Sequence, residues 1–149
     1  MKVKKWFILC LCVLSMAVLS GCGGESGKGS GSAYDVKIDI DLTAMSNTVV
    51  YSEVYNMVMD PDSFIGKTVK MAGVLSFYRL GSNGICYACV VDDATACCQQ
   101  GIEFELAGTD KDDPEAYPEL GEKITLVGVM DTYEDEDYIY CVLRDAVLL

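Results

Sequence analysis

The cysteines are the side chains whose type and spacing could do chemistry in this sequence. Cys86 and Cys89 are separated by two residues, and Cys97 and Cys98 are adjacent. Thiolates bind soft and borderline metal ions such as copper and zinc, whereas thiols outside the cytoplasm usually pair as disulfides. These four residues are therefore a candidate zinc or copper site or a thiol-redox site. We expect no bound cofactor other than this possible zinc.

Strand geometry limits how these thiols can pair. The segment around Cys86 and Cys89 reads as a strand, which would separate their Cα atoms by about 10 Å and point the side chains to opposite faces. A disulfide tolerates only about 7 Å. A hairpin turn at 92–95 would instead place Cys89 opposite Cys98, or opposite Cys97 after a slip of one residue. Disulfide candidates are thus Cys89, Cys97 and Cys98, and buried inert thiols are a further alternative.

One cysteine stands apart from the others. Cys141 follows Tyr140 in an apolar segment and shares an alternating face with Ile139 and Leu143. We expect it to be a small buried residue of the core.

Composition excludes several function classes. The 149 residues include no histidine, which removes the commonest general base and any Ser-His-Asp arrangement. The net charge of −12 is unfavourable for phosphate backbones, so we expect no nucleic acid as a partner. The acidic run at 131–137 lacks the spacing of a calcium loop and reads as a solvated hairpin tip. We predict no catalytic residues and no enzyme activity.

Tyrosines are the second group of interest. The chain holds nine, several of them in strand-like segments. On an exposed barrel face they could form a platform that stacks on sugars or bases. They are also common as ordinary strand formers, which is the interpretation we favour, and exposure decides between the two.

The N-terminus has the features of an export signal. Three lysines precede an apolar run at 6–19, which is short for a membrane-spanning helix. Leu19-Ser20-Gly21-Cys22 resembles the lipobox of bacterial lipoproteins. The resemblance implies cleavage before Cys22 and attachment of lipid, such as palmitate, to that cysteine.

This reading divides the chain into three parts. Residues 1–21 are the predicted lipoprotein signal peptide, 22–35 the lipidated cysteine and a Gly/Ser-rich flexible tether, and 36–149 the folded domain. Removal of 1–21 takes three lysines and leaves 8 basic and 23 acidic side chains, a net charge of −15. We therefore expect a protein on the extracytoplasmic face of the cell membrane, held by lipid rather than by a basic patch.

The elements that would position the cysteines and tyrosines are mostly strands. Alternation predicts a short strand at 36–42, and apolar spacing from Tyr51 predicts a helix ending at Asp60 with Val54, Tyr55 and Val58 on its buried face. Five strand-like segments follow, at 67–78, 85–92, 101–107, 122–132 and 138–148, with a polar stretch at 109–118. Residues 65–74 align with 120–129 without a gap, so Gly66 and Gly73 match Gly121 and Gly128.

Five strands with long, bent first and fourth members resemble the OB-fold. We expect a mainly β domain: a five-stranded OB-fold barrel with one N-terminal helix and a short helical or irregular element between strands 3 and 4. The chain from 57 onward is similar to uncharacterised small bacterial OB-fold lipoproteins of permease-associated type, in the segments 60–67, 93–101 and 140–146.

Together these observations indicate a non-catalytic, lipid-anchored binding or accessory module. The alternative is a metal-handling or thiol-redox lipoprotein acting with a membrane transporter, a partner that the resemblance implies.

Overall fold

The computed structural model describes residues 36–81 and 84–149. The predicted signal peptide at 1–21, the tether at 22–35 and the lipid-attachment residue Cys22 lie outside the described residues. Within the described part, every helix is too short or too polar to span a membrane.

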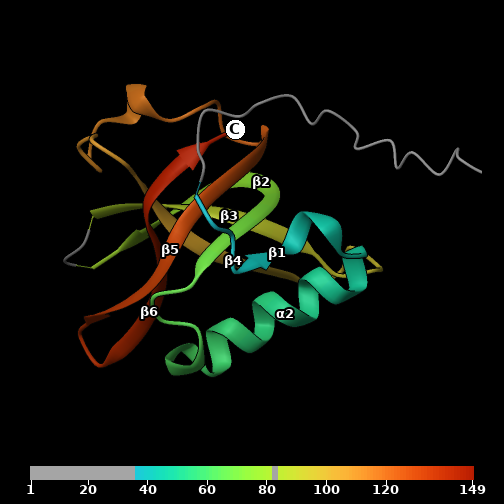
Figure 1. The fold of residues 1–149 in the computed structure, drawn as a ribbon. Coiled ribbons are helices and arrows are strands. Elements are labelled where there is room, and N and C mark those ends of the chain that lie inside the picture. Colours follow the sequence, from blue (N-terminus) through green and yellow to red (C-terminus); the bar gives the residue numbers. More distant parts are fainter. Residues whose placement is uncertain (1–35, 82–83) are drawn as a thin grey trace, which may run out of the picture. The chain divides into compact units, whose positions relative to one another are not determined.

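Five long strands and one helix dominate the domain (Figure 1). The strands are β2 (Thr68–Leu80), β3 (Gly84–Asp92), β4 (Gln99–Leu106), β5 (Lys123–Asp135) and β6 (Tyr138–Leu148). The helix α2 (Asn47–Met59) precedes them. Short 3-10 turns occupy Leu42–Ala44 (η1), Pro61–Ser63 (η2) and Pro114–Ala116 (η3). η3 is the short element expected between the third and fourth long strands.

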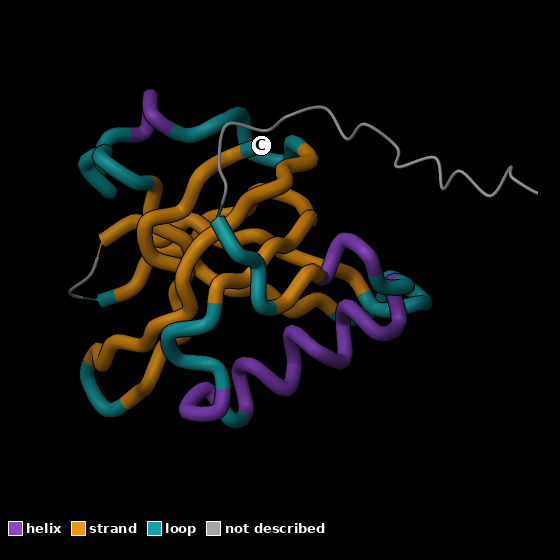
Figure 2. Tube along the Cα trace, viewed as in Figure 1, coloured by secondary structure: helices purple, strands orange, loops and turns teal. Residues whose placement is uncertain are grey.

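The strand order closes the sheet into a barrel. With the short strand β1 (Ile40–Asp41) included, neighbours run β1-β2-β3-β4-β6-β5, and β2 also pairs with β5. β4 and β6 are parallel, whereas the other pairs of long strands are antiparallel. This is the arrangement of an OB-fold-like barrel, so the predicted fold class is confirmed. Figure 2 shows the strands forming one curved layer, with the loops and helices outside it.

The first predicted strand is much shorter than expected. Only Ile40–Asp41 forms β1, parallel to Val69 and Lys70 of β2. The reason is local: the Asp41 carboxylate accepts hydrogen bonds from the backbone N–H and the hydroxyl of Thr43. These bonds start η1 and end the strand, as Asp commonly does at the first position of a helical turn.

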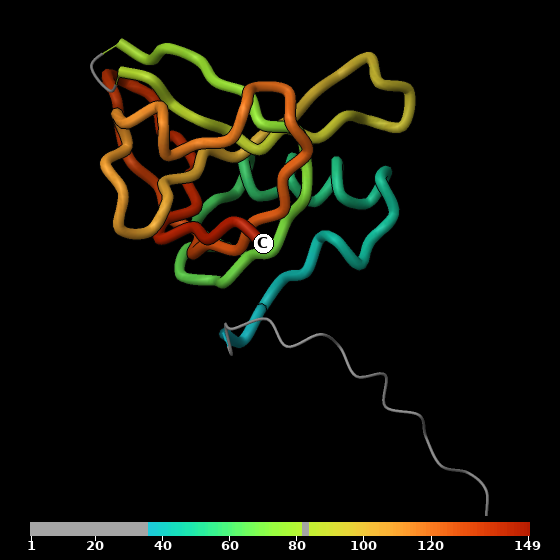
Figure 3. Tube along the Cα trace, turned by 90° about the horizontal axis from the view of Figure 1, so that it is seen from above, coloured from blue at the N-terminus to red at the C-terminus, as the bar shows by residue number. Residues whose placement is uncertain are grey.

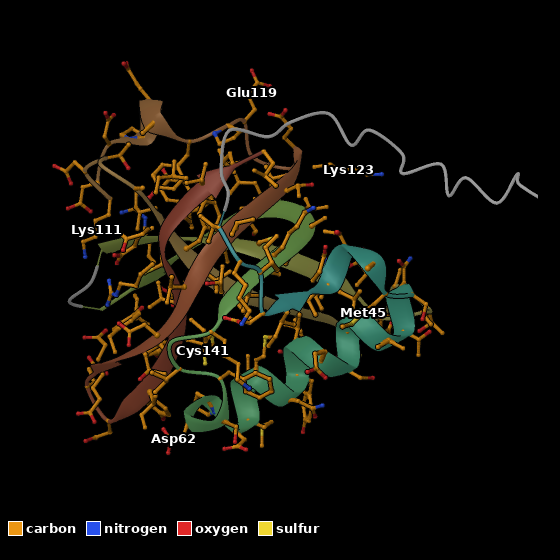
Figure 4. The ribbon with its side chains drawn as sticks, in the orientation of Figure 1. Met45, Asp62, Lys111, Glu119, Lys123 and Cys141 are labelled. Carbon is orange, nitrogen blue, oxygen red and sulfur yellow. The ribbon has the colours of Figure 1, made fainter. Side chains whose placement is uncertain are left out.

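Helix α2 packs on the barrel through only part of the predicted face: Tyr51 and Val54 contact the core as expected, and Met57 takes the place of Tyr55 and Val58. Val54 and Met57 are fully buried, but Tyr55 and Val58 are 46% and 39% exposed. The helix meets β6 where Cys141 lies, at the junction of barrel and helix in Figure 4. The Cys141 thiol contacts the Met57 carbonyl at 3.6 Å, and the side chain is buried as predicted.

The two aligned segments adopt the same local conformation. Gly66 and Gly121 both have φ in the left-handed region, +80° and +85°, at the entries to β2 and β5. In the two strands that follow, Gly73 and Gly128 lie in tightly packed positions. A Cβ on Gly128 would come within 2.9 Å of the Leu143 Cβ, and the β5–β6 register shifts at this residue. The mid-strand glycines thus mark bends, as the sequence indicated.

Gly73 lies where β2 changes partners. Residues 68–74 of β2 pair with β5, and residues 74–80 pair with β3. A Cβ on Gly73 would lie 2.4 Å from the Val90 carbonyl oxygen and 2.8 Å from the Cys89 sulfur. Only a glycine allows this close approach of backbones, which closes the barrel.

Replacing Gly73 with alanine should destabilise the domain by about 3 kcal/mol, because the new methyl group overlaps backbone rather than a movable side chain. Gly66→Ala is the matched comparison, since it has open space and loses only the freedom to adopt a positive φ, at roughly 1 kcal/mol. Chemical denaturation measures both. Equal losses in the two variants would contradict the role of Gly73 in closure.

Candidate functional site

The loop between β3 and β4 has a different register from the one predicted. Val91 pairs with Gln100 and Asp92 with Gln99, so the loop comprises the six residues 93–98. The predicted pairing of Cys89 with Cys98 or Cys97 across a turn at 92–95 is wrong. Cys89 lies opposite Ile102 in the ladder instead. Figure 3 shows this loop, coloured yellow, projecting from the barrel.

Asp93 sets this register. Its Oδ1 accepts the backbone N–H groups of Thr95 and Cys97, each at 3.0 Å, and its own N–H donates to the Cys98 carbonyl at 2.9 Å. Ala96 takes a left-handed φ of +54°, which completes the turn. Burial opposes ionisation of Asp93, but the hydrogen bonds from Cys97 and Thr95 outweigh it and lower the pKa. One aspartate therefore organises the whole loop.

The folded loop brings two thiols and a carboxylate together. The sulfurs of Cys97 and Cys98 are 3.5 Å apart, and the Cys97 sulfur is 3.3 Å from Oδ2 of Asp93. Both thiols are exposed and no disulfide joins them. The hydrogen bond and the charge interaction with Cys97 raise the pKa of the Cys98 thiol. Among the described residues, this is the cluster of three metal-ligating side chains whose donor atoms all lie within 4.8 Å.

The other predicted ligands lie elsewhere, which corrects the four-thiol metal set. β3 is regular through its pairing with β2, so Cys86 opposite Tyr78 and Cys89 opposite Leu75 point to opposite faces. Cys89 is fully buried in the core, and this burial raises the pKa of its thiol to about 12. The structure brings neither residue into the loop cluster, and it joins no pair among Cys89, Cys97 and Cys98 by a disulfide.

A second candidate is a hollow of about 410 Å³ on the outer face of the barrel. Its floor crosses β2, β3 and β4 at the aligned positions Ser76, Ala88 and Glu103. Small residues make the depression, since Ser76, Ala88 and Gly101 carry little or no side chain. The complete lining is Val58, Ser76, Tyr78, Ala88, Val90, Gln99, Gln100, Gly101, Glu103, Ile139, Tyr140 and Cys141.

Glu103 is the charged group of this hollow and is 7% exposed. Tyr78 donates a hydrogen bond to its Oε1, and Tyr133 donates to its Oε2 at 2.7 Å. Burial raises the pKa of Glu103, against the Tyr133 hydrogen bond, which lowers it. Both carboxylate oxygens thus have phenol partners, and the two tyrosines are held in place around the hollow.

The β5–β6 hairpin forms one wall of the hollow. Tyr140 lines the hollow and stacks on Tyr133, with ring centroids 5.4 Å apart. At the tip, Tyr138 and Ile139 are 67% and 63% exposed. Arg144 of β6 bonds Glu105 of β4 and lies 3.1 Å from Oδ2 of Asp131 on β5, which ties the hairpin to β4. Tyr78, Tyr133 and Tyr140 therefore gather here, whereas Tyr87 is buried in the core and stacks on Tyr117. No sequence pattern identified the small residues of the hollow.

Comparisons with known proteins give one distant likeness. No protein family and no curated protein matches the sequence. A crystal structure described as a "putative nucleic acid-binding lipoprotein" from Klebsiella pneumoniae is similar in fold, at 18% identity and a TM-score of 0.44. The match covers 75% of this chain and 92% of that chain. That protein is described as a lipoprotein. No family match supports the permease-associated type for this chain.

The same description corrects one expectation. We expected no nucleic acid as a partner on the basis of net charge, and a structural neighbour is described as nucleic acid-binding. The exclusion was wrong as a general rule, because net charge belongs to the whole molecule whereas a binding surface is local.

Glu103 gives a test of the hollow's electrostatics. Because burial raises the pKa in the folded state, the folded protein holds this proton more tightly than the unfolded chain does. The stability contribution is therefore greatest at low pH and is lost as pH rises. The melting temperature of the wild type relative to Glu103→Gln should fall as pH rises above about 4.3, the pKa of an unfolded glutamate.

Thermal unfolding at a series of pH values measures the difference in melting temperature between the wild type and Glu103→Gln. The other carboxylates are present in both proteins, so their titration cancels from this difference. Glu119→Gln, on the exposed connection before β5, gives the baseline for loss of one surface charge. A difference that rises with pH would show that the phenol hydrogen bonds dominate over burial.

Proposed function

We propose that this protein is a lipid-anchored, non-catalytic binding module on the extracytoplasmic face of the cell membrane. The lipobox at Cys22 and the Gly/Ser-rich tether support the anchorage, and the barrel supplies the binding surface. The hollow over β2, β3 and β4 carries the proposal, since this face and the flanking hairpin form the usual ligand surface of OB-folds.

The lining favours a neutral saccharide as the ligand. Gln99 and Gln100 supply amide donors and acceptors, and Tyr78 and Tyr140 supply rings for stacking on a sugar face. The lining contains a carboxylate and no lysine or arginine, which suits hydroxyl groups. A volume of about 410 Å³ lies within the roughly 300–1,000 Å³ of small-molecule sites.

The carboxylates in and beside the hollow already have hydrogen-bond or ion-pair partners, which supports a binding role over a catalytic one. Tyr78 and Tyr133 occupy both oxygens of Glu103, and Arg144 pairs with Glu105 and Asp131. A pair of carboxylates for acid–base work needs one group with access to substrate and a second held in a contrasting environment. In this arrangement the carboxylates instead fix tyrosines and strands in position.

The lipid on Cys22 would attach the protein to the membrane. The resemblance of the sequence to permease-associated lipoproteins makes a membrane permease the candidate protein partner. Metal handling is the second candidate function. The exposed pair of thiols in the β3–β4 loop favours it.

Filling the hollow should abolish saccharide binding. Ser76 is exposed on its floor, so Ser76→Trp adds a bulky ring without disturbing the core. With tri-N-acetylchitotriose as the probe, titration calorimetry should show at least about a ten-fold loss of affinity relative to wild type. Ser52→Trp, on the exposed side of α2 and outside the lining, should bind as wild type does.

The same titration with a single-stranded oligonucleotide separates two ligand classes. Oligonucleotide binding that Ser76→Trp removes, without any saccharide binding, would contradict the saccharide assignment and keep the hollow as the binding surface. Equal binding of the saccharide by both tryptophan variants would contradict the hollow itself.

Lipid attachment has its own test in growing cells. Cys22→Ser should abolish incorporation of labelled palmitate, because the lipid is attached through this thiol. Cys12→Ser, within the predicted signal peptide, is the matched control and should remain lipidated. Incorporation of labelled palmitate into Cys22→Ser would contradict the anchor.

A further inference from the structure

The β3–β4 loop holds a donor set that the barrel-face function does not use. Asp93, Cys97 and Cys98 project from the barrel on a loop that hydrogen bonds fold into a compact turn. Adjacent side chains in a strand point to opposite faces, so two neighbouring cysteines would normally diverge. Here the turn through Ala96 brings both sulfurs to one side.

Two of the three spacings between the donor atoms are close to those at the corners of a tetrahedron around a metal ion, and the third, between Cys98 and Asp93, is within 4.8 Å. With zinc–sulfur bonds of about 2.3 Å and zinc–oxygen bonds of about 2.0 Å, tetrahedral angles give about 3.8 Å between sulfurs and about 3.5 Å between sulfur and oxygen. The observed distances are 3.5 Å between Cys97 and Cys98, and 3.3 Å between Cys97 and Oδ2 of Asp93. Small side-chain movements would complete the geometry.

We propose that Asp93, Cys97 and Cys98 form a zinc-binding site at the tip of the β3–β4 loop. Each thiol releases its proton to solvent as its sulfur bonds the ion, so the two thiolates and the carboxylate supply three negative charges to Zn²⁺. No oxidation or reduction occurs. The site is independent of the saccharide surface, and either can exist without the other.

The sulfur spacing disfavours linear coordination of copper(I). Two thiolates that bind one ion in a line would hold their sulfurs roughly 4.6 Å apart at the same bond length. The observed 3.5 Å is shorter than either ideal and lies closer to the tetrahedral one. The carboxylate ligand also favours zinc, because hard oxygen ligands suit zinc better than copper(I).

The fourth corner of the tetrahedron faces solvent. Cys97 and Cys98 are both exposed, and among described residues no further His, Cys, Asp or Glu joins the cluster. Structural zinc sites have four protein ligands, whereas sites that exchange their ion or bind a further group keep a position open. The site would therefore exchange its zinc readily, as a protein that receives and passes on the ion requires.

Cadmium provides a spectroscopic test, because it takes the same ligands and gives an ultraviolet thiolate charge-transfer band. The full chain, purified from membranes in detergent and reduced, should bind one Cd²⁺ with this band, and Zn²⁺ should compete it away. Cys97→Ser and Cys98→Ser should each weaken binding by roughly 100-fold. Asp93→Asn should weaken it by about ten-fold, since asparagine keeps the acceptor that folds the loop and removes only the charge.

Cys89→Ala is the matched control, because it removes a buried thiol outside the loop and should retain the band. Circular dichroism checks that each variant is folded. A band that survives in the Cys97→Ser/Cys98→Ser double variant would overturn the proposal. Two other results would also overturn the proposal: reduced wild-type protein that binds no cadmium, and wild-type protein that forms a Cys97–Cys98 disulfide in the presence of zinc.

Discussion

The close approach of β2 to β3 at Gly73 is the constraint on which the rest of the domain depends. Without a side chain at this position, β2 can leave β5 and join β3 within one residue, and the sheet closes. Closure sets the curvature of β2, β3 and β4, and so aligns Ser76, Ala88 and Glu103 on one outer face. The candidate binding surface is a consequence of this bend.

Much of the fold follows from the sequence. Alternation and turn residues predict five strands whose observed limits differ by only a few residues, and the matched glycines predict two bends that the structure contains. These features are local, because a strand pattern or a glycine reports its own backbone conformation. The buried face of α2 was less predictable, since the barrel surface beneath it decides that Met57 is buried and Val58 exposed.

The candidate sites were harder to predict, for a physical reason. The sequence identified Cys97 and Cys98, but the length of the hairpin loop decides their neighbours. One aspartate side chain, Asp93, satisfies two backbone N–H groups and lengthens the loop to six residues, which separates both thiols from Cys89. The hollow depends on small side chains from three strands lying side by side, a non-local arrangement that a linear pattern does not reveal.

The proposed ligand surface is the outer face over β2, β3 and β4, beside the β5–β6 hairpin. Hydrogen–deuterium exchange of the full chain, with and without saturating tri-N-acetylchitotriose, tests it most directly because it locates protection along the sequence. Slower exchange is expected in residues 99–103 and 138–141, and unchanged exchange in residues 47–55 of α2, which lie outside the lining. Protection confined to other segments, or none at all, would contradict it.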